Sequence, residues 1–198
     1  DPERLKVVLM QMVTLMRDGM PEKMSKRSGE AITMANLLEE VPVDAARFLF
    51  NSYVPNTRID FDLDLAVKED SQNPVYYVQY AHARICSILR NLAEDGITPR
   101  PCTSGELALL TAPEEIELIR LLSNFTDEIA GAARAMDPAR ITRYVLNVGT
   151  LFHKFYNACR VKGVEPELTA ARLCLCTAAK TVLENGLALF KVSAPERM

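Results

Sequence analysis

The first third of the chain alternates between strand-like and helix-like patterns. Residues 7–15 are rich in β-branched and apolar side chains and predict a strand, and residues 17–19 predict a turn because they end in a glycine. Thr33 predicts the N-cap of a short helix that ends before Pro42, and residues 43–53 predict a second helix. This alternation indicates a small α/β unit.

Residues 59–65 alternate strictly between apolar and acidic side chains, which predicts that Asp60, Asp62 and Asp64 share one side. Three neighbouring carboxylates are compatible with a divalent metal site. A solvated edge that guides the chain between two domains is the other interpretation. The second is favoured, because neither a fourth oxygen ligand nor a glycine follows at the spacing of a calcium loop.

Beyond residue 70 the apolar period becomes that of helices. Helices are predicted from about 75 to 93 after Pro74, from Pro113 through Ile129, from Asp137-Pro138 to Cys159, and from about 167 to 185 with Gly186 as the stop. Because the four apolar stripes match, the sequence predicts an antiparallel bundle. The expected fold class is therefore mainly α, with a bundle preceded by the small α/β unit.

Length and charge narrow the functional classes. The chain has 198 residues, 48% of them hydrophobic, so a sizeable core can form. No apolar run is long enough to span a bilayer, so no membrane partner is expected. The net charge of −3 argues against DNA as a partner, and RNA binding would require basic groups gathered on one face. The opening at Asp1, directly in an apolar segment, suggests a piece of a longer protein.

The cysteine pattern does not indicate a metal site. There are five cysteines, an odd number without a C-x-x-C pair, and only His82 and His153 could assist them. Tetrahedral zinc sites need four well-spaced ligands, so no metal ligand is predicted. We interpret the cysteines as small core residues that stay reduced in a cytoplasmic protein.

One basic loop carries the clearest chemistry. This lysine loop reads Lys23-Met24-Ser25-Lys26-Arg27-Ser28-Gly29. Breaking the α–β bond of ATP moves negative charge onto pyrophosphate, and cations that bind this charge accelerate the step. Lys23 and Lys26 are therefore candidate catalytic residues, and Arg27 could add a bidentate contact. Ser25 could donate a hydrogen bond, and Met24 could anchor the loop beside the adenine. The alternative is an ordinary basic surface loop.

The loop resembles the second signature loop of class I aminoacyl-tRNA synthetases in its arginyl-tRNA synthetase version, with Arg27 where many class I relatives carry serine. Residues 61–66 and 73–84 resemble the entry to the anticodon-binding domain of that family. Asp137-Pro138-Ala139-Arg140 resembles the motif that gives the domain its name. Residues 155–161 and 193–198 also fit, so the resemblance covers the whole chain.

The resemblance implies attachment of arginine to its tRNA through an arginyl-adenylate. The substrates of the full-length enzyme would be tRNA, L-arginine and ATP with Mg²⁺, and no tightly bound cofactor is expected in this fragment. Residues 1–70 would end the catalytic domain and residues 71–198 would form the anticodon-binding domain. The family's His-x-Gly-His signature is absent, so this fragment should not aminoacylate alone. The alternative is a non-catalytic RNA-binding or scaffold module with an idle lysine loop.

Candidate tRNA contacts begin on the first long helix. Tyr76, Tyr80 and Arg84 are spaced by four and share one helix face. Exposed aromatic rings can stack on splayed bases, and arginine can stack or contact phosphate. The alternative is that the tyrosines are core residues with hydroxyls at the rim, which is favoured for Tyr77. His82 is interpreted as a structural histidine.

Further candidates lie near the end of the chain. Tyr156 and Asn157 fit packing and anticodon contact equally well, and Arg160 could belong to a basic surface. The resemblance places Arg197 and Met198 beside the anticodon loop, whereas the alternative is a frayed terminus.

Overall fold

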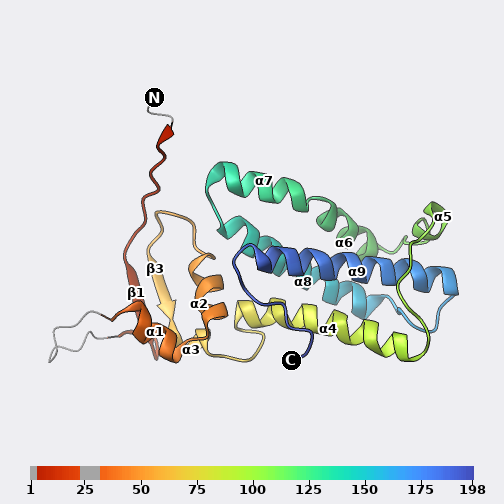
Figure 1. The fold of residues 1–198 in the computed structure, drawn as a ribbon, viewed down its shortest axis with the longest axis horizontal. Helices are drawn as coiled ribbons and strands as arrows, with labels where there is room; N and C mark the ends of the chain where they lie inside the picture. Colours follow the sequence, from red (N-terminus) through yellow and green to blue (C-terminus); the bar gives the residue numbers. More distant parts are fainter. Residues whose placement is uncertain (1–3, 23–31) are drawn as a thin grey trace.

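The structure, a computed structural model, describes residues 4–22 and 32–198. Its elements in chain order are β1 (Val13–Arg17), β2 (Met20–Pro21), α1 (Met34–Glu40), α2 (Val43–Phe50), β3 (Ile59–Asp62), α3 (Leu63–Ala66), α4 (Pro74–Glu94), α5 (Ser104–Leu107), α6 (Pro113–Ser123), α7 (Phe125–Ala135), α8 (Ala139–Ala158) and α9 (Pro166–Ala188). A bundle of long helices lies beside a small unit that holds the strands (Figure 1). The predicted fold class is confirmed. No helix of the described residues is long and apolar enough to cross a membrane.

The small sheet of the described residues has the order β2-β1-β3. β1 pairs with β2 in antiparallel fashion across a turn in which Asp18 and Gly19 both have positive φ, at 51° and 71°. This turn matches the sequence prediction and suits a two-residue hairpin. β1 pairs with β3 in parallel, beginning with Val13 opposite Ile59. The strand predicted from residue 7 therefore starts only at Val13, because β3 offers no partner earlier.

The period-two pattern of residues 59–65 holds only through Asp62. A side-chain oxygen of Asp62 accepts a hydrogen bond from the backbone N–H of Leu65 at 2.9 Å and caps α3. The chain therefore turns into a helix where the alternation predicted a longer strand. Ile59 and Phe61 are buried, as the alternation requires.

The other two aspartates of this segment have separate partners. Asp60 pairs with Arg58 at 3.6 Å, and Asp64 accepts a hydrogen bond from the backbone N–H of Asp18 at 2.6 Å. Within residues 4–22 and 32–198, no three His, Cys, Asp or Glu side chains are grouped to hold a metal ion. Asp62 therefore caps α3, Asp60 pairs with Arg58 on the surface, and Asp64 bonds the turn between β1 and β2.

Local start signals place the helices well. Thr33 forms a capping box with Asn36 at the start of α1, and the Asn73 side chain caps α4 just before Pro74. Asp137 accepts a hydrogen bond from the backbone N–H of Ala139 at the start of α8, at 3.1 Å. Each of these interactions spans three residues or fewer, so local sequence sets where these helices begin. The predicted C-terminal end of one helix was wrong, since the helix predicted to reach residue 53 ends at Phe50.

The single helix predicted from Pro113 through Ile129 is in fact two helices, α6 and α7, which break at Asn124. The carbonyl of Leu121 accepts the N–H of Asn124 at 3.1 Å and the hydroxyl of Tyr144 at 2.7 Å. Tyr144 is buried on α8, and burial raises the pKa of its hydroxyl to about 12. A side chain from another helix therefore bonds a carbonyl at the break, which the apolar stripe alone does not reveal.

Gly186 was predicted to end the last helix, but α9 continues through it to Ala188. A Cβ at Gly186 would lie 2.4 Å from Cγ1 of Val145 on α8. The glycine therefore allows two helices to cross closely, and it does not act as a cap. The helix ends at Ala188, and the turn after it closes at Lys191, whose φ of 55° is left-handed, with the N–H of Val192 bonded to the carbonyl of Leu187 at 3.1 Å.

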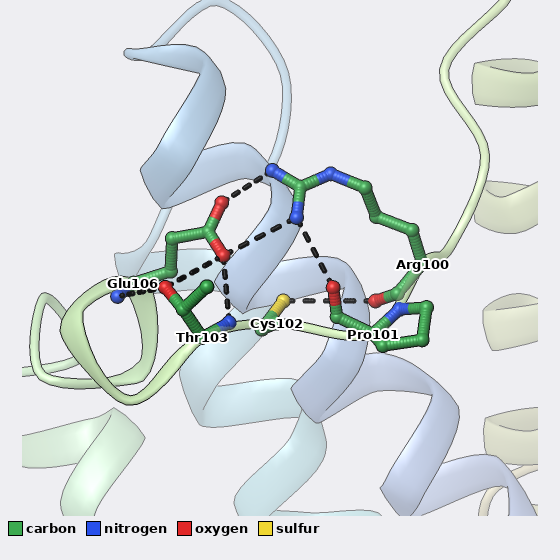
Figure 2. A network of polar contacts seen from close by, with 5 residues as sticks. All are labelled: Arg100, Pro101, Cys102, Thr103 and Glu106. Atoms are coloured by element: carbon green, nitrogen blue, oxygen red, sulfur yellow. Dashed lines mark hydrogen bonds and ion pairs between the residues drawn. The ribbon is translucent and has the colours of Figure 1, made fainter.

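A short helix, α5, was not predicted, and Figure 2 shows the contacts that form it. Thr103 and Glu106 make a capping box, in which Glu106 accepts the N–H of Thr103 at 2.7 Å. Arg100 donates to the same carboxylate. The hydrogen bond from Arg100, followed by that from Thr103, lowers the pKa of Glu106 to about 2. The box holds the long connection between α4 and α6.

The hydrophobic core runs without interruption from the small unit into the bundle. Phe50 of α2 stacks on Phe61 of β3 with ring centroids 4.7 Å apart, and α2 also packs against α4. In the bundle, α8 packs against α4, α6, α7 and α9 and provides the fully buried Phe152 and Phe155. The domain division between residues 70 and 71 stays a prediction.

Candidate nucleic-acid interface

A groove of about 850 Å³ lies between α4, the end of α8 and the C-terminal tail. It brings together residues that are far apart in the sequence, including most of the predicted tRNA contacts. Those contacts are Tyr80, Arg84, Tyr156, Arg160, Arg197 and Met198. Helix period explains why Tyr80 and Arg84 share a face, but only the packing of α8 and the tail places the others beside them.

An arginine that stacks on one tyrosine and donates a hydrogen bond to another forms one wall of the groove. The guanidinium carbon of Arg84 lies 5.1 Å from the ring centroid of Tyr156. The same guanidinium donates a hydrogen bond to the Tyr80 hydroxyl at 3.2 Å. Tyr156 in turn stacks on Phe152, with centroids 6.1 Å apart, and Phe152 is fully buried. The wall is therefore held from the core, while Tyr80 stays 39% exposed.

The groove is positively charged although the chain as a whole is acidic. Five basic side chains line it against two carboxylates: Arg84, Arg90, Arg160, Lys162 and Arg197 against Asp95 and Glu196. Lys162 pairs with Asp95 at one end. The backbone of Arg160 is fixed, because its carbonyl accepts a hydrogen bond from Arg172 at 2.6 Å. Basic groups concentrated in this way attract a polyanion.

His153 lies behind this wall and is half-buried. Its ring centroid is 5.5 Å from that of Tyr77 and 6.1 Å from that of Tyr80. Burial lowers the pKa of His153, and the nearby positive charge of Arg84 lowers it further. Tyr77 packs between helices, with its hydroxyl 3.3 Å from Thr150, which supports its interpretation as a packing residue.

The C-terminal tail lies along α4 and is held by hydrogen bonds (Figure 1). His82 is buried, and its Nδ1 lies 2.9 Å from the carbonyl of Pro195. A carbonyl can only accept, so Nδ1 carries the hydrogen. Arg90 donates to the carbonyl of Glu196 at 3.2 Å. The structural interpretation of His82 is confirmed, and the tail is a fixed part of the groove.

Comparison with known proteins fits this architecture. Residues 78–198 match the model of the DALR anticodon binding domain. This chain belongs to that family. Along its whole length it is 54% identical to an arginine–tRNA ligase of Caldanaerobacter subterraneus and 50% identical to one of Acetivibrio thermocellus. It spans about 35% of the length of each of these relatives.

The fold is also similar to a solved structure. Thermus thermophilus arginyl-tRNA synthetase superposes with a TM-score of 0.74 at 26% identity, over 93% of this chain and 34% of that one. The match includes the small unit as well as the DALR domain, because it covers more of the chain than residues 78–198.

Two predicted tRNA contacts lie outside the groove. Tyr76 is half-buried one turn before Tyr80 on α4. Asn157 is exposed and lines a second, shallower hollow with Lys154 and Glu114. Their role in tRNA binding stays a prediction. The predicted ATP contacts lie outside the described residues: Lys23, Met24, Ser25, Lys26 and Arg27.

Other groove residues of the DALR domain were missed. Ser87, Asn91 and Asp95 continue the face of Tyr80 and Arg84 at helical spacing, so extending that stripe along α4 would have found them. Lys162 follows α8 in a loop, and no periodic pattern points to it. Only the tertiary structure brings it to the groove.

Proposed function

We propose that this chain is the tRNA-reading part of an arginine–tRNA ligase, with the groove as its contact to the anticodon loop. The complete enzyme would attach arginine to tRNA through an arginyl-adenylate, using ATP and Mg²⁺. The observation that carries the proposal is the basic, aromatic groove in a domain whose relatives are arginine–tRNA ligases. Nothing in the comparisons supports the alternative of a non-catalytic scaffold.

The side chains of the groove suit an unstacked RNA strand. Tyr80 offers an exposed ring face beside Arg84, on which a splayed base could stack. Arg160 and Arg197 offer charge to neighbouring phosphates. Stacking tolerates many bases, so the preference for particular anticodon bases would come from hydrogen bonds made deeper in the groove.

The lysine loop would bind ATP. Lys23 and Lys26 would bind the pyrophosphate of ATP as it leaves, with Ser25, Met24 and Arg27 holding the nucleotide. Mg²⁺ would neutralise phosphate charge when it is bound with ATP. We place this activity in the cytoplasm, where tRNA is charged. The amino-acid pocket would lie mainly in the part of the enzyme that this chain does not include.

Binding of tRNA to the complete protein tests this proposal. We expect Tyr80→Ala and Arg84→Ala each to weaken binding of arginine tRNA about tenfold, the scale of one lost stacking contact. Arg84→Ala should also flatten the salt dependence of affinity if the guanidinium contacts phosphate. Fluorescence titration at several salt concentrations measures both effects.

The matched control is Arg120→Ala, which removes an exposed arginine of α6 that does not line the groove. It should bind like the parent protein. A second arm uses the same tRNA with its anticodon replaced. If the replaced anticodon binds the parent protein equally well, the groove does not read the anticodon and the proposal is wrong.

A further inference from the structure

The tail that borders the groove is tied to a helix outside the bundle. The carboxylate of Asp44, on α2, accepts the backbone N–H of Ser193 at 3.1 Å and also the Ser193 hydroxyl. Gln79 of α4 donates to the same Asp44 oxygen at 3.0 Å. It also donates to the Ser193 carbonyl at 3.0 Å. We call Asp44, Gln79 and Ser193 the tail clamp.

The tail clamp is well placed to control the residues that follow it. It fixes Ser193, and His82 and Arg90 hold the carbonyls of Pro195 and Glu196. The next two residues are Arg197 and Met198, which line the groove. Gln79 is only 9% exposed, so its contacts face little competition from water. A carboxylate that accepts three donors makes strong, charge-assisted bonds.

We propose that Asp44 is a positioning residue for RNA binding, although it does not line the groove itself. By ordering the tail before RNA arrives, it lowers the conformational entropy that binding would otherwise cost. It also makes the groove depend on α2, a helix of the small unit. This inference rests on the proposed function of the groove.

The sign of the effect separates positioning from simple electrostatics. Removing a negative charge should strengthen RNA binding if Asp44 acts only through its field. The positioning role predicts weaker binding, because the tail loses its anchor. A purely structural role predicts a lower melting temperature with RNA affinity unchanged in the folded protein.

The test uses the complete protein and arginine tRNA, with affinity from fluorescence titration and folding from thermal unfolding. Asp44→Ala and Ser193→Ala should each weaken tRNA binding about five- to tenfold. Asp44→Asn should retain part of the affinity, because its amide oxygen still accepts hydrogen bonds. Asp60→Ala is the matched control, since it removes an exposed carboxylate of β3 and should leave binding unchanged.

A double-mutant cycle decides whether Asp44 acts through the tail. In a protein that already carries Arg197→Ala and Met198→Ala, Asp44→Ala should have no further effect on affinity. An equal loss in both backgrounds overturns the inference, as does unchanged or tighter binding by Asp44→Ala. Should Asp44→Ala fail to fold, Ser193→Ala replaces it in the cycle, because it leaves the carboxylate and Gln79 in place.

The outcome also distinguishes the two proposals. If Tyr80→Ala and Arg84→Ala weaken binding but both tail-clamp variants do not, the groove binds RNA and only the positioning inference fails. If neither set of variants weakens binding, the proposed function of the groove fails as well.

Discussion

At the scale of single residues, the groove depends on side chains that the core holds in place. Arg84 is fixed by Tyr156 and Tyr80, and Tyr156 is fixed by the fully buried Phe152. A ring that is already held loses little rotamer freedom when a base stacks on it. His153 lies on the inner side of the same cluster, so its pKa responds to the charge of Arg84.

The titration of His153 is the first prediction at this scale. Burial and then the charge of Arg84 lower its pKa below the ordinary 6.5. The folded state therefore disfavours the protonated ring, so the contribution of His153 to stability is present above pH 6.5 and is lost as the pH falls through the folded pKa. NMR titration of the imidazole should give a pKa below 6.5.

Arg84→Ala should raise that pKa, because one of its two causes is gone, whereas Arg120→Ala should leave it in place. A value for His153 at or above its ordinary pKa in the parent protein would contradict the environment that the structure gives this side chain.

At the scale of elements, the close crossing of α8 and α9 sets the shape of the bundle. Gly186 is the point of contact, and its missing Cβ leaves room for Val145. Valine has a stiff χ1, so it cannot readily turn away from an added methyl group. The crossing is therefore sensitive to a single carbon atom.

Gly186→Ala should destabilise the protein by about 1–3 kcal/mol, the usual cost of overpacking a core. Helix propensity alone predicts the opposite sign, because alanine is a better helix former than glycine. Chemical denaturation measures the difference. Val145→Ala should reduce the penalty when both changes are combined. A stabilised Gly186→Ala would show that the glycine serves no packing role.

The helix break at Asn124 also depends on a side chain from another helix. The Tyr144 hydroxyl bonds the carbonyl of Leu121 across the bundle and favours an end to α6 at that point. In contrast, the capping residues Thr33 and Thr103 act within one turn of their own helices. Elements therefore begin where local chemistry sets them, and some end where a distant side chain decides.

At the scale of the whole molecule, the small unit and the bundle share one continuous core. The small unit packs through α2 on α4 and joins the tail through the tail clamp. We expect that the proposed roles of the lysine loop and of the groove can be separated by substitution.

Lys26→Ala in the complete enzyme should reduce arginine-dependent ATP–pyrophosphate exchange about 10²-fold or more, the scale for losing one preorganised charge contact in a transition state. Binding of tRNA should stay near the parent value. Lys68→Ala is the control, because it removes an exposed lysine outside the loop. Unchanged exchange in Lys26→Ala would argue against a role of the loop in the adenylation step.

The sequence by itself determined the helical bundle, the starts of its long helices and the pairing of Tyr80 with Arg84 on one face. These features follow from periodicity and capping, which act over a few residues. The charges of the lysine loop marked it as a candidate ATP site. The family resemblance supported that loop and added the tail, and the comparisons support the resemblance.

Tertiary structure alone decided the groove, the role of Gly186 and the ties between Asp44 and the tail. Lys162 comes to the groove from the end of α8, and Ser193 meets Asp44 across 149 positions of sequence. These long-range contacts depend on how the helices pack, and the packing is set by the whole core. They therefore produce no periodic pattern in the sequence.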